Sequence, residues 1–542
     1  AADPGNPAPD RWMDGRGCNL ALVGLLLLVS TPVTGAAYFR DWAASPELHR
    51  ATDGDLVHVA DYLNQQDLSS TTPYVASQHY RHPTVAFLSD DYDRIRWLVG
   101  GETLVFPSDE AGLVIFPRSA SRYLEWAEAL LTDDALIAAP LGPDHSPDFY
   151  AYRVDGGYHP DPERTRRADF GHIAQLLGYS VADPPRSGDQ VELSVWLRVR
   201  GTPERQDYSP VVRLTDREGF IWGESHPFHY PSEQWLPDQV IVEHFSFPVS
   251  PGAPPGDYVV RFGLYSPGGD VRLPLLNAEG AYAGTYIELP IYLGRPEAPP
   301  LVEDLAITSW VNATMGGLTL LGSDFEAMTA RPGERLFVTL FWQAEKASLP
   351  SHPVSLRLGD RYLYEGDPGH GTYPFDKWLQ GEIVSDRYGP RVPLDTPPGD
   401  YPLEIQVGEM VVDLGRVMVE KTDRTFDVPA MAHKVGRRLG DQVELLGYDL
   451  SANSYAPGAT LTLTLYWRAL EPMSRDYTVF THLVAPDGSM TGQRDNQPVG
   501  GSYPTGLWLP DEVVTDVYEI AVHPDAPEGE HRLETGMYLP DT

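Results

Sequence analysis

One aromatic motif occurs three times in the second part of this chain, and it constrains the fold more than any other feature. The motif Tyr-Pro-x-x-x-Trp-Leu keeps its spacing in every copy and begins at Tyr230, Tyr373 and Tyr503. A glycine stands 21 residues after each motif tryptophan, at Gly256, Gly399 and Gly529. Each copy is far longer than one repeat of a solenoid, so we expect three tandem domains, each with its own core.

Each copy is predicted to be an immunoglobulin-like β-sandwich. The segments VELSVW, LFVTLFW and LTLTLYW alternate apolar residues and end at Trp196, Trp342 and Trp467. Alternation with a period of two is typical of a strand with one buried face. The 50 Gly and 51 Pro residues supply turns for many short strands. We therefore predict a mainly β protein, with sandwiches over residues 161–297, 298–428 and 429–542. The third is expected to be truncated, lacking one or two strands and leaving an open sheet edge.

Residues 41–160 are predicted to form a small α/β domain before the repeats. Helical spacing of apolar residues covers 55–65 and 121–131. Short apolar segments predict strands at 73–76, 85–88, 103–106, 112–116 and 149–154. Helices and strands that alternate over this length favour one α/β unit.

This domain contains one candidate for a metal site. His79 and His82 stand near Asp90, Asp91 and Asp93, and such groups can bind a divalent cation. Paired carboxylates could also act in glycoside chemistry. The spacing matches no metal motif, so we favour a solvated loop. The chain also lacks a dinucleotide-binding glycine motif, a phosphate loop and a nucleophile elbow. We therefore predict no catalytic, cofactor-binding or metal-binding residues.

An apolar segment near the N-terminus is predicted to cross a membrane. The 23 residues between Arg16 and Arg40 carry no charge, and a helix of that length spans roughly 35 Å, enough for a hydrocarbon core of about 30 Å. We predict a flank over residues 1–17 and a transmembrane helix over residues 18–40. A signal peptide cleaved near Gly35 and a buried core helix are the alternatives. In either membrane interpretation, the bulk of the chain lies outside the cytoplasm.

The net charge narrows the classes of partner. Asp and Glu total 77 against 40 Lys and Arg, which gives a formal charge of −37. Such a balance excludes a general nucleic-acid binder and argues against broad adhesion to anionic lipid. The single cysteine, Cys18, excludes an internal disulfide framework and a thiolate metal cluster.

The repeated aromatic residues allow two interpretations. Exposed rings could stack on sugars, which would make carbohydrate contacts of Tyr230, Trp235, Tyr373, Trp378, Tyr503 and Trp508. Alternatively, the same rings fill the modules and stabilise a long loop between strands. We favour the second interpretation, because a residue repeated at fixed spacing in every copy is what folding of the module requires.

Whole phrases of the chain resemble a known family. The phrases that carry the resemblance are WAASPELHRATDGDLVHVADYLNQ, which begins at Trp42, and later LLGYDL, LTLYWRAL, YTVFTHLVAPDG and YPTGLWLPDEVV. They are similar to the C-terminal extracytoplasmic region of multi-spanning glycosyltransferases from Chloroflexi-type bacteria, relatives of the protein mannosyltransferases and the aminoarabinose transferase. The resemblance implies a polyprenyl-phosphate-linked sugar donor. It also implies a catalytic acidic residue far upstream, so it assigns no catalytic residue here.

The leading functional expectation is an accessory region of such an enzyme, with the bulk of the chain outside the cell membrane. It would position an acceptor or contact cell-envelope glycan or protein. Two alternatives remain: a non-enzymatic, membrane-anchored adhesion or structural protein, and a secreted array of carbohydrate-binding modules.

Overall fold

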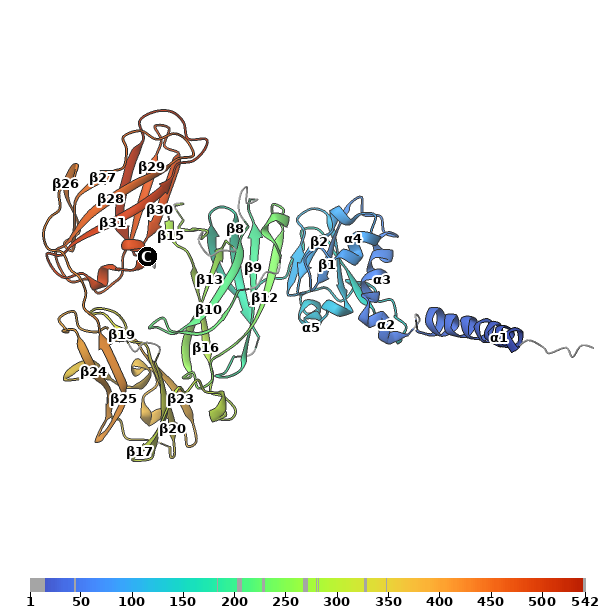
Figure 1. The fold of residues 1–542 in the computed structure, drawn as a ribbon, viewed down its shortest axis with the longest axis horizontal. Coiled ribbons are helices and arrows are strands. Elements are labelled where there is room, and N and C mark those ends of the chain that lie inside the picture. The colour runs from blue at the N-terminus through green and yellow to red at the C-terminus, as the bar shows by residue number, and fades with distance from the viewer. Residues whose placement is uncertain are drawn as a thin grey trace, which may run out of the picture.

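The computed structural model shows a mostly β protein with a helix at its N-terminus (Figure 1). It describes residues 15–539 except 43–44, 183, 202–206, 227–229, 267–271, 279, 281, 326–328 and 348. Most of the predicted flank 1–17 therefore lies outside the described residues. The mainly β class, with a small α/β unit followed by sandwiches, is confirmed.

The N-terminal helix stands apart from the domains. Helix α1 (Gly15–Ala36) continues into η1 (Ala37–Trp42), away from the rest of the molecule (Figure 1). Its apolar part, Leu22–Arg40, has a mean hydropathy of 1.8, and none of it is buried against the protein. Such a helix is long and apolar enough to cross a membrane or to serve as a signal sequence. The alternative of a buried core helix is wrong.

A five-stranded sheet forms the centre of the α/β domain. Its order is β2-β1-β4-β6-β5, with β1 parallel to β2 and β4, and β6 antiparallel to β4. The strands are β1 (Thr71–Ser77), β2 (Arg96–Val99), β4 (Ala111–Pro117), β5 (Leu136–Ala138) and β6 (Phe149–Val154). The helices are α2 (Pro46–Ala51), α3 (Gly54–Leu63), α4 (Pro83–Leu88) and α5 (Leu124–Glu128).

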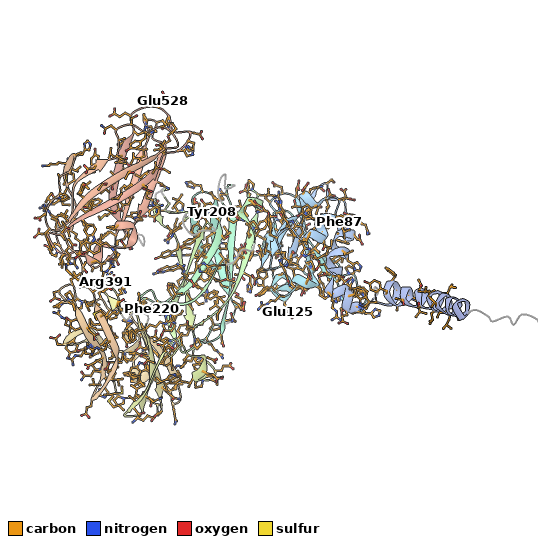
Figure 2. The ribbon with its side chains drawn as sticks, viewed as in Figure 1. Phe87, Glu125, Tyr208, Phe220, Arg391 and Glu528 are labelled. Atoms are coloured by element: carbon orange, nitrogen blue, oxygen red, sulfur yellow. The ribbon has the colours of Figure 1, made fainter. Side chains whose placement is uncertain are left out.

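The segment 85–88, predicted as a strand, is part of helix α4. Pro83 lies in its first turn, where no N–H partner is required, and His82 Nδ1 accepts a hydrogen bond from Thr84 N at 3.3 Å. In this helix only Val85 is buried, whereas Phe87 is 89% exposed (Figure 2). The segment thus buries one side only, whereas a strand inside a parallel sheet is covered on both faces. The helix predicted at 121–131 is also shorter, since α5 spans only five residues.

The α/β domain and the first sandwich share a sheet. Strand β3 (Thr103–Phe106) lies in the α/β part of the sequence but does not join the α/β sheet. It pairs antiparallel with β12 (Val240–Pro248), so that Phe106 lies opposite Val240. The buried Thr103 Oγ1 donates to Glu243 Oε2 at 2.8 Å. One hydrophobic core runs from the α/β domain into the sandwich. The hydrophobic core therefore continues across the predicted domain boundary at residue 160.

Two sheets build the first sandwich. Their orders are β11-β10-β13-β16 and β15-β14-β7-β8-β9-β12-β3. The remaining strands are β7 (Arg164–Phe170), β8 (Ala174–Val181), β9 (Gln190–Val199), β10 (Ser209–Thr215), β11 (Ile221–Ser225), β13 (Gly256–Tyr265), β14 (Leu275–Leu276), β15 (Tyr282–Gly284) and β16 (Ile287–Leu293).

The second sandwich has the orders β17-β18-β20-β23 and β19-β25-β24-β21-β22. Its strands are β17 (Ser309–Met315), β18 (Leu318–Phe325), β19 (Thr329–Ala330), β20 (Val338–Ala344), β21 (Val354–Leu358), β22 (Arg361–Gly366), β23 (Ile383–Tyr388), β24 (Gly399–Val407) and β25 (Met410–Val419).

The third sandwich has the orders β26-β27-β28-β31 and β30-β29-β32. Its strands are β26 (His433–Leu439), β27 (Val443–Leu450), β28 (Thr460–Ala469), β29 (Thr478–Val484), β30 (Met490–Asn496), β31 (Val513–Ala521) and β32 (Arg532–Tyr538). The predicted tryptophans at the ends of the alternating segments lie buried in the equivalent strands β9, β20 and β28 of the three modules.

One edge of the third sandwich differs from its counterparts. Strand β24 pairs with β21 and β25, and β13 pairs with β10 and β16, but within the described chain β32 pairs only with β29. A cavity of about 630 Å³ opens beside it, lined by core residues that include Leu461, Leu483 and Leu533.

Candidate functional site

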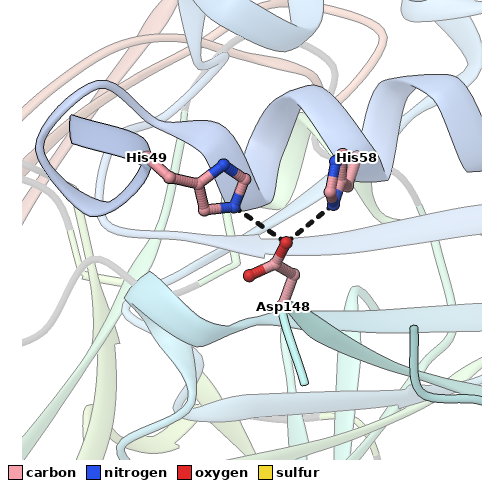
Figure 3. A group of neighbouring side chains, drawn as sticks. All are labelled: His49, His58 and Asp148. Carbon is pink, nitrogen blue, oxygen red and sulfur yellow. Dashed lines mark hydrogen bonds and ion pairs between the residues drawn. The ribbon is translucent and has the colours of Figure 1, made fainter. Parts of the chain in front are cut away.

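Two histidines converge on one buried carboxylate in the α/β domain. Asp148 immediately precedes β6, and its side chain is fully buried. Its Oδ2 atom lies 2.8 Å from His49 Nε2 and 2.7 Å from His58 Nδ1 (Figure 3). His49 belongs to α2 and His58 to α3. Three separate elements therefore bring these three side chains together.

The cluster lies at the carboxyl end of a sheet strand. Because β6 runs antiparallel to β4, Phe149 lies opposite Pro117, the last residue of β4. Asp148 thus faces the loop that follows β4, where Arg118 N donates to Asp148 O at 2.7 Å. In α/β sheets, ligands bind outside the carboxyl ends of the parallel strands. The cluster occupies this position beside β4.

Arg118 orients the carboxylate of Asp148. Its Nη2 atom donates to Asp148 Oδ1, and its Nη1 atom lies 2.6 Å from Asp144 Oδ2. The hydrogen bond from the backbone N–H of Ser146 is the main cause that lowers the pKa of Asp144, and Arg118 lowers it further. The guanidinium therefore occupies one oxygen of Asp148 and leaves the other to the imidazoles, with two carboxylates sharing one positive charge.

Two glycines permit this close packing. A Cβ atom on Gly54 would lie 2.2 Å from His49 Nδ1, and one on Gly142 would lie 2.3 Å from Asp148 Oδ1. Asp55 Oδ2, next to Gly54, accepts a hydrogen bond from Ser119 N at 2.8 Å and ties α3 to the loop after β4. A larger residue at either glycine would displace a group of the cluster.

The cluster can act chemically in two ways. Two imidazole nitrogens and one carboxylate oxygen are the donor types that first-row divalent metals accept in proteins. Alternatively, both rings donate their N–H to Asp148 Oδ2, and Arg118 completes a hydrogen-bonded hub. His49 is 15% exposed and His58 is 40% exposed, so solvent reaches the histidine side of the cluster.

The histidines that the sequence singles out lie elsewhere. The rings of His79 and His82 are 6.0 Å apart, and His82 Nε2 lies 3.8 Å from Asp53. His82 also caps α4, and Asp90 N donates to Asn64 Oδ1. Within the described parts of the chain, only His49, His58 and Asp148 have the arrangement of a metal site. The sequence offers no spacing motif for them, since Asp148 is remote from both histidines.

The aromatic residues considered for sugar contact are mostly buried inside the modules. Trp235 is 3% exposed, Trp378 1% and Trp508 0%, and only Tyr503 among the six candidates is partly exposed. The indole N–H of each motif tryptophan donates to the backbone oxygen of the motif tyrosine, at 3.2, 3.0 and 3.1 Å in chain order. The motif thus closes its own loop, which favours the folding interpretation over a sugar-stacking platform.

In the second and third modules, an arginine from the preceding linker contacts the motif. Arg295 Nη2 donates to Lys377 O at 2.7 Å, and its guanidinium lies 5.5 Å from the ring centre of Tyr373. Arg424 Nη1 donates to Tyr503 Oη at 2.8 Å. Burial is the largest cause that raises the pKa of both tyrosine hydroxyls, and the hydrogen bond to a neighbouring glutamate raises it further. Each motif therefore anchors the chain that enters its module.

The first motif contacts the α/β domain instead. Gln234 Oε1 accepts from Trp97 N at 2.8 Å, and Gln234 Nε2 donates to Trp97 O at 3.1 Å. Tyr80 also donates to Glu233. All three motifs therefore lie at a junction between a module and the part of the chain that precedes it.

Direct contacts between sandwiches add to these junctions. The guanidinium of Arg387 lies 3.9 Å from the ring centre of Trp222, which joins the second sandwich to the first. Arg391 Nη2 lies 2.6 Å from Asp476 Oδ2, which joins the second to the third (Figure 2). The sandwiches thus meet through specific polar contacts.

Comparison with known proteins yields only distant structural neighbours. No protein-family model and no curated protein matches the chain. A native E. coli alpha-2-macroglobulin matches with 12% identity over 87% of this chain and 28% of its own, at a TM-score of 0.14. A Salmonella alpha-2-macroglobulin mutant matches with 10% identity over 81% of this chain and 33% of its own, also at a TM-score of 0.14. This chain spans about a third or less of either protein, and the scores are too low to indicate a shared arrangement of domains.

Proposed function

We propose that this chain is the extracytoplasmic accessory region of a membrane glycosyltransferase. In this proposal, Leu22–Arg40 anchors it in the membrane, and the sandwiches hold an acceptor or contact the cell envelope. The observation that carries the proposal is the placement of every aromatic motif at a domain junction, where it contacts a part of the chain that precedes its module. The family resemblance of the repeated phrases supplies the enzyme class.

The order of parts supports a positioning role. The α/β domain follows the apolar helix directly, so an anchored helix would keep this domain beside the membrane (Figure 1). The α/β domain and the first sandwich share one core, and the later sandwiches are joined to them by Arg387 and Arg391. Contacts of this kind restrict the motion of a module relative to its neighbours, which a free linker would allow. A surface held at a set distance from the membrane suits the delivery of an acceptor.

The complete reading frame and a transfer assay test this proposal. We expect a series of hydrophobic spans upstream and, in native membranes, transfer from a polyprenyl-phosphate-linked sugar. Arg424→Ala, which loosens the last junction, should lower transfer to a large acceptor, whereas the exposed variant Arg416→Ala should not. A reading frame without upstream spans, or equal transfer by both variants, would contradict the proposal.

A membrane-anchored adhesion or structural protein is the second candidate. The same anchor and joined modules support it, because a set of joined sandwiches also presents a surface away from the membrane. It requires no upstream catalytic core, so the complete reading frame separates it from the first proposal.

A further inference from the structure

We propose that His49, His58 and Asp148 bind a divalent transition-metal ion, with Zn²⁺ the ion that best suits this donor set. The three ligand atoms lie within 4.8 Å of one another. Zinc–ligand bonds of about 2.0–2.1 Å at tetrahedral angles place neighbouring donors roughly 3.3 Å apart. The imidazole nitrogens are now 2.7 and 2.8 Å from Asp148 Oδ2, so each of these two nitrogen–oxygen distances would lengthen by about half an ångström around the ion. This proposal does not depend on the glycosyltransferase role.

The surroundings of Asp148 favour a single-oxygen ligand. Arg118 occupies Oδ1 and leaves Oδ2 directed at both histidines. A ligand carboxylate whose second oxygen is hydrogen-bonded is typical of protein metal sites, because this contact fixes its orientation. Asp144 also pairs with Arg118, so these three charged groups sum to one negative charge. The cluster is therefore electrostatically able to accept a cation.

The backbone holds the donors in place before any ion binds. Gly54 lets the His49 ring lie against the start of α3, and Gly142 leaves room for the Asp148 carboxylate. His58 projects from the same helix α3, which Asp55 ties to the loop after β4. Donors on short packed elements lose little freedom when a metal binds, which favours affinity.

The proposed site keeps an open coordination position. Three protein ligands plus a water or substrate molecule distinguish catalytic zinc sites from structural sites with four protein ligands. His58 is 40% exposed, so the ion would be accessible from the histidine side. Water or an anionic group from solution would complete the tetrahedron there.

A metal titration of the full chain tests the proposal. The protein is purified in detergent without a histidine tag, stripped with chelator, and titrated with ZnCl₂ by calorimetry and with CoCl₂ by visible absorption. We expect one equivalent of each ion to bind and the Co²⁺ complex to show the strong visible bands of tetrahedral coordination. Absence of stoichiometric binding would overturn the proposal in favour of the hydrogen-bonded hub.

Variants locate the bound ion. His58→Ala removes a half-exposed ligand and should weaken binding at least about 100-fold, as should His49→Ala. His79→Ala, in the same domain and exposed, serves as the matched control and should bind like the unmodified chain. Circular dichroism verifies the fold of each variant. Unchanged binding by folded His58→Ala, or loss of binding in folded His79→Ala, would place the ion elsewhere and overturn the proposal. Neither result bears on the reading frame or on sugar transfer.

Discussion

Arg424 provides the sharpest test of the junction between the second and third sandwiches. Its Nη1 atom donates to Tyr503 Oη and Leu507 O, both at 2.8 Å, and lies 2.6 Å from Glu512 Oε2. The arginine side chain is 11% exposed and that of Glu512 only 2%. Arg424→Ala would therefore leave a buried carboxylate without its cation.

The size of the expected effect follows from what remains around Glu512. Removing one partner of a buried ion pair typically costs about 3–5 kcal/mol. Tyr503 Oη at 2.7 Å and Leu509 N at 2.8 Å still donate to this carboxylate, so the lower end of the range, about 3 kcal/mol, applies. A loss of that size should speed amide exchange around residues 503–520 roughly 100-fold, provided that exchange there proceeds through local opening.

Hydrogen exchange measured by mass spectrometry is the suitable assay, because a chain of several domains does not unfold in one transition. Arg416→Ala is the matched control: its partner is Asp400 at 2.6 Å, and the two side chains are 54% and 45% exposed. A pair so exposed contributes at most about 1 kcal/mol. If Arg424→Ala changes exchange no more than Arg416→Ala does, the buried pair does not stabilise the junction.

Three further changes should have measurable effects. Burial raises the pKa of Asp386 from 3.8 to about 6, so the native state binds the proton more tightly than the unfolded state does. The free energy of unfolding of the second sandwich should therefore fall by up to about 3 kcal/mol as the pH rises through this window. Asp386→Asn should remove this pH dependence. Trp378→Ala, at a side chain 1% exposed, should destabilise the second sandwich by about 3–5 kcal/mol. A copy of residues 410–419 fused after residue 542 should pair with β32 and raise the melting temperature of the third sandwich by about 5 °C or more.

Each of these predictions has its own control and contrary outcome. If Asp386 does not titrate in this window, the unfolding midpoint of the second sandwich should change with pH equally in the unmodified chain and in Asp386→Asn. Trp310 is 58% exposed in the same sandwich, so Trp310→Ala should change stability by less than about 0.5 kcal/mol. A fused segment in which Leu414, Val417 and Val419 are serines should not stabilise the third sandwich; equal melting of both fusions would show that β32 does not accept a strand.

The repeated sandwiches could be predicted from the sequence because their signals are local. Alternating apolar residues identify the strands that contain Trp196, Trp342 and Trp467, since the alternation itself marks a buried face whatever the partner strand is. The apolar helix before Arg40 is equally evident, because composition and length alone determine whether it can span a bilayer. By contrast, the segment 85–88 was ambiguous, because a short apolar run fits a strand or one helical turn.

Only the tertiary structure decided which distant residues meet. Asp148 joins His49 and His58 because β6 pairs antiparallel with β4, which brings the residue just before β6 to the carboxyl end of β4, beside α2 and α3. In the same way, β3 joins the sheet of the first sandwich, and Arg424 meets the motif of the module that it precedes. Such contacts depend on strand order and on packing between elements far apart in the chain. A single sequence displays local periodicity, but it does not display these long-range pairings, so the candidate site became evident only in the fold.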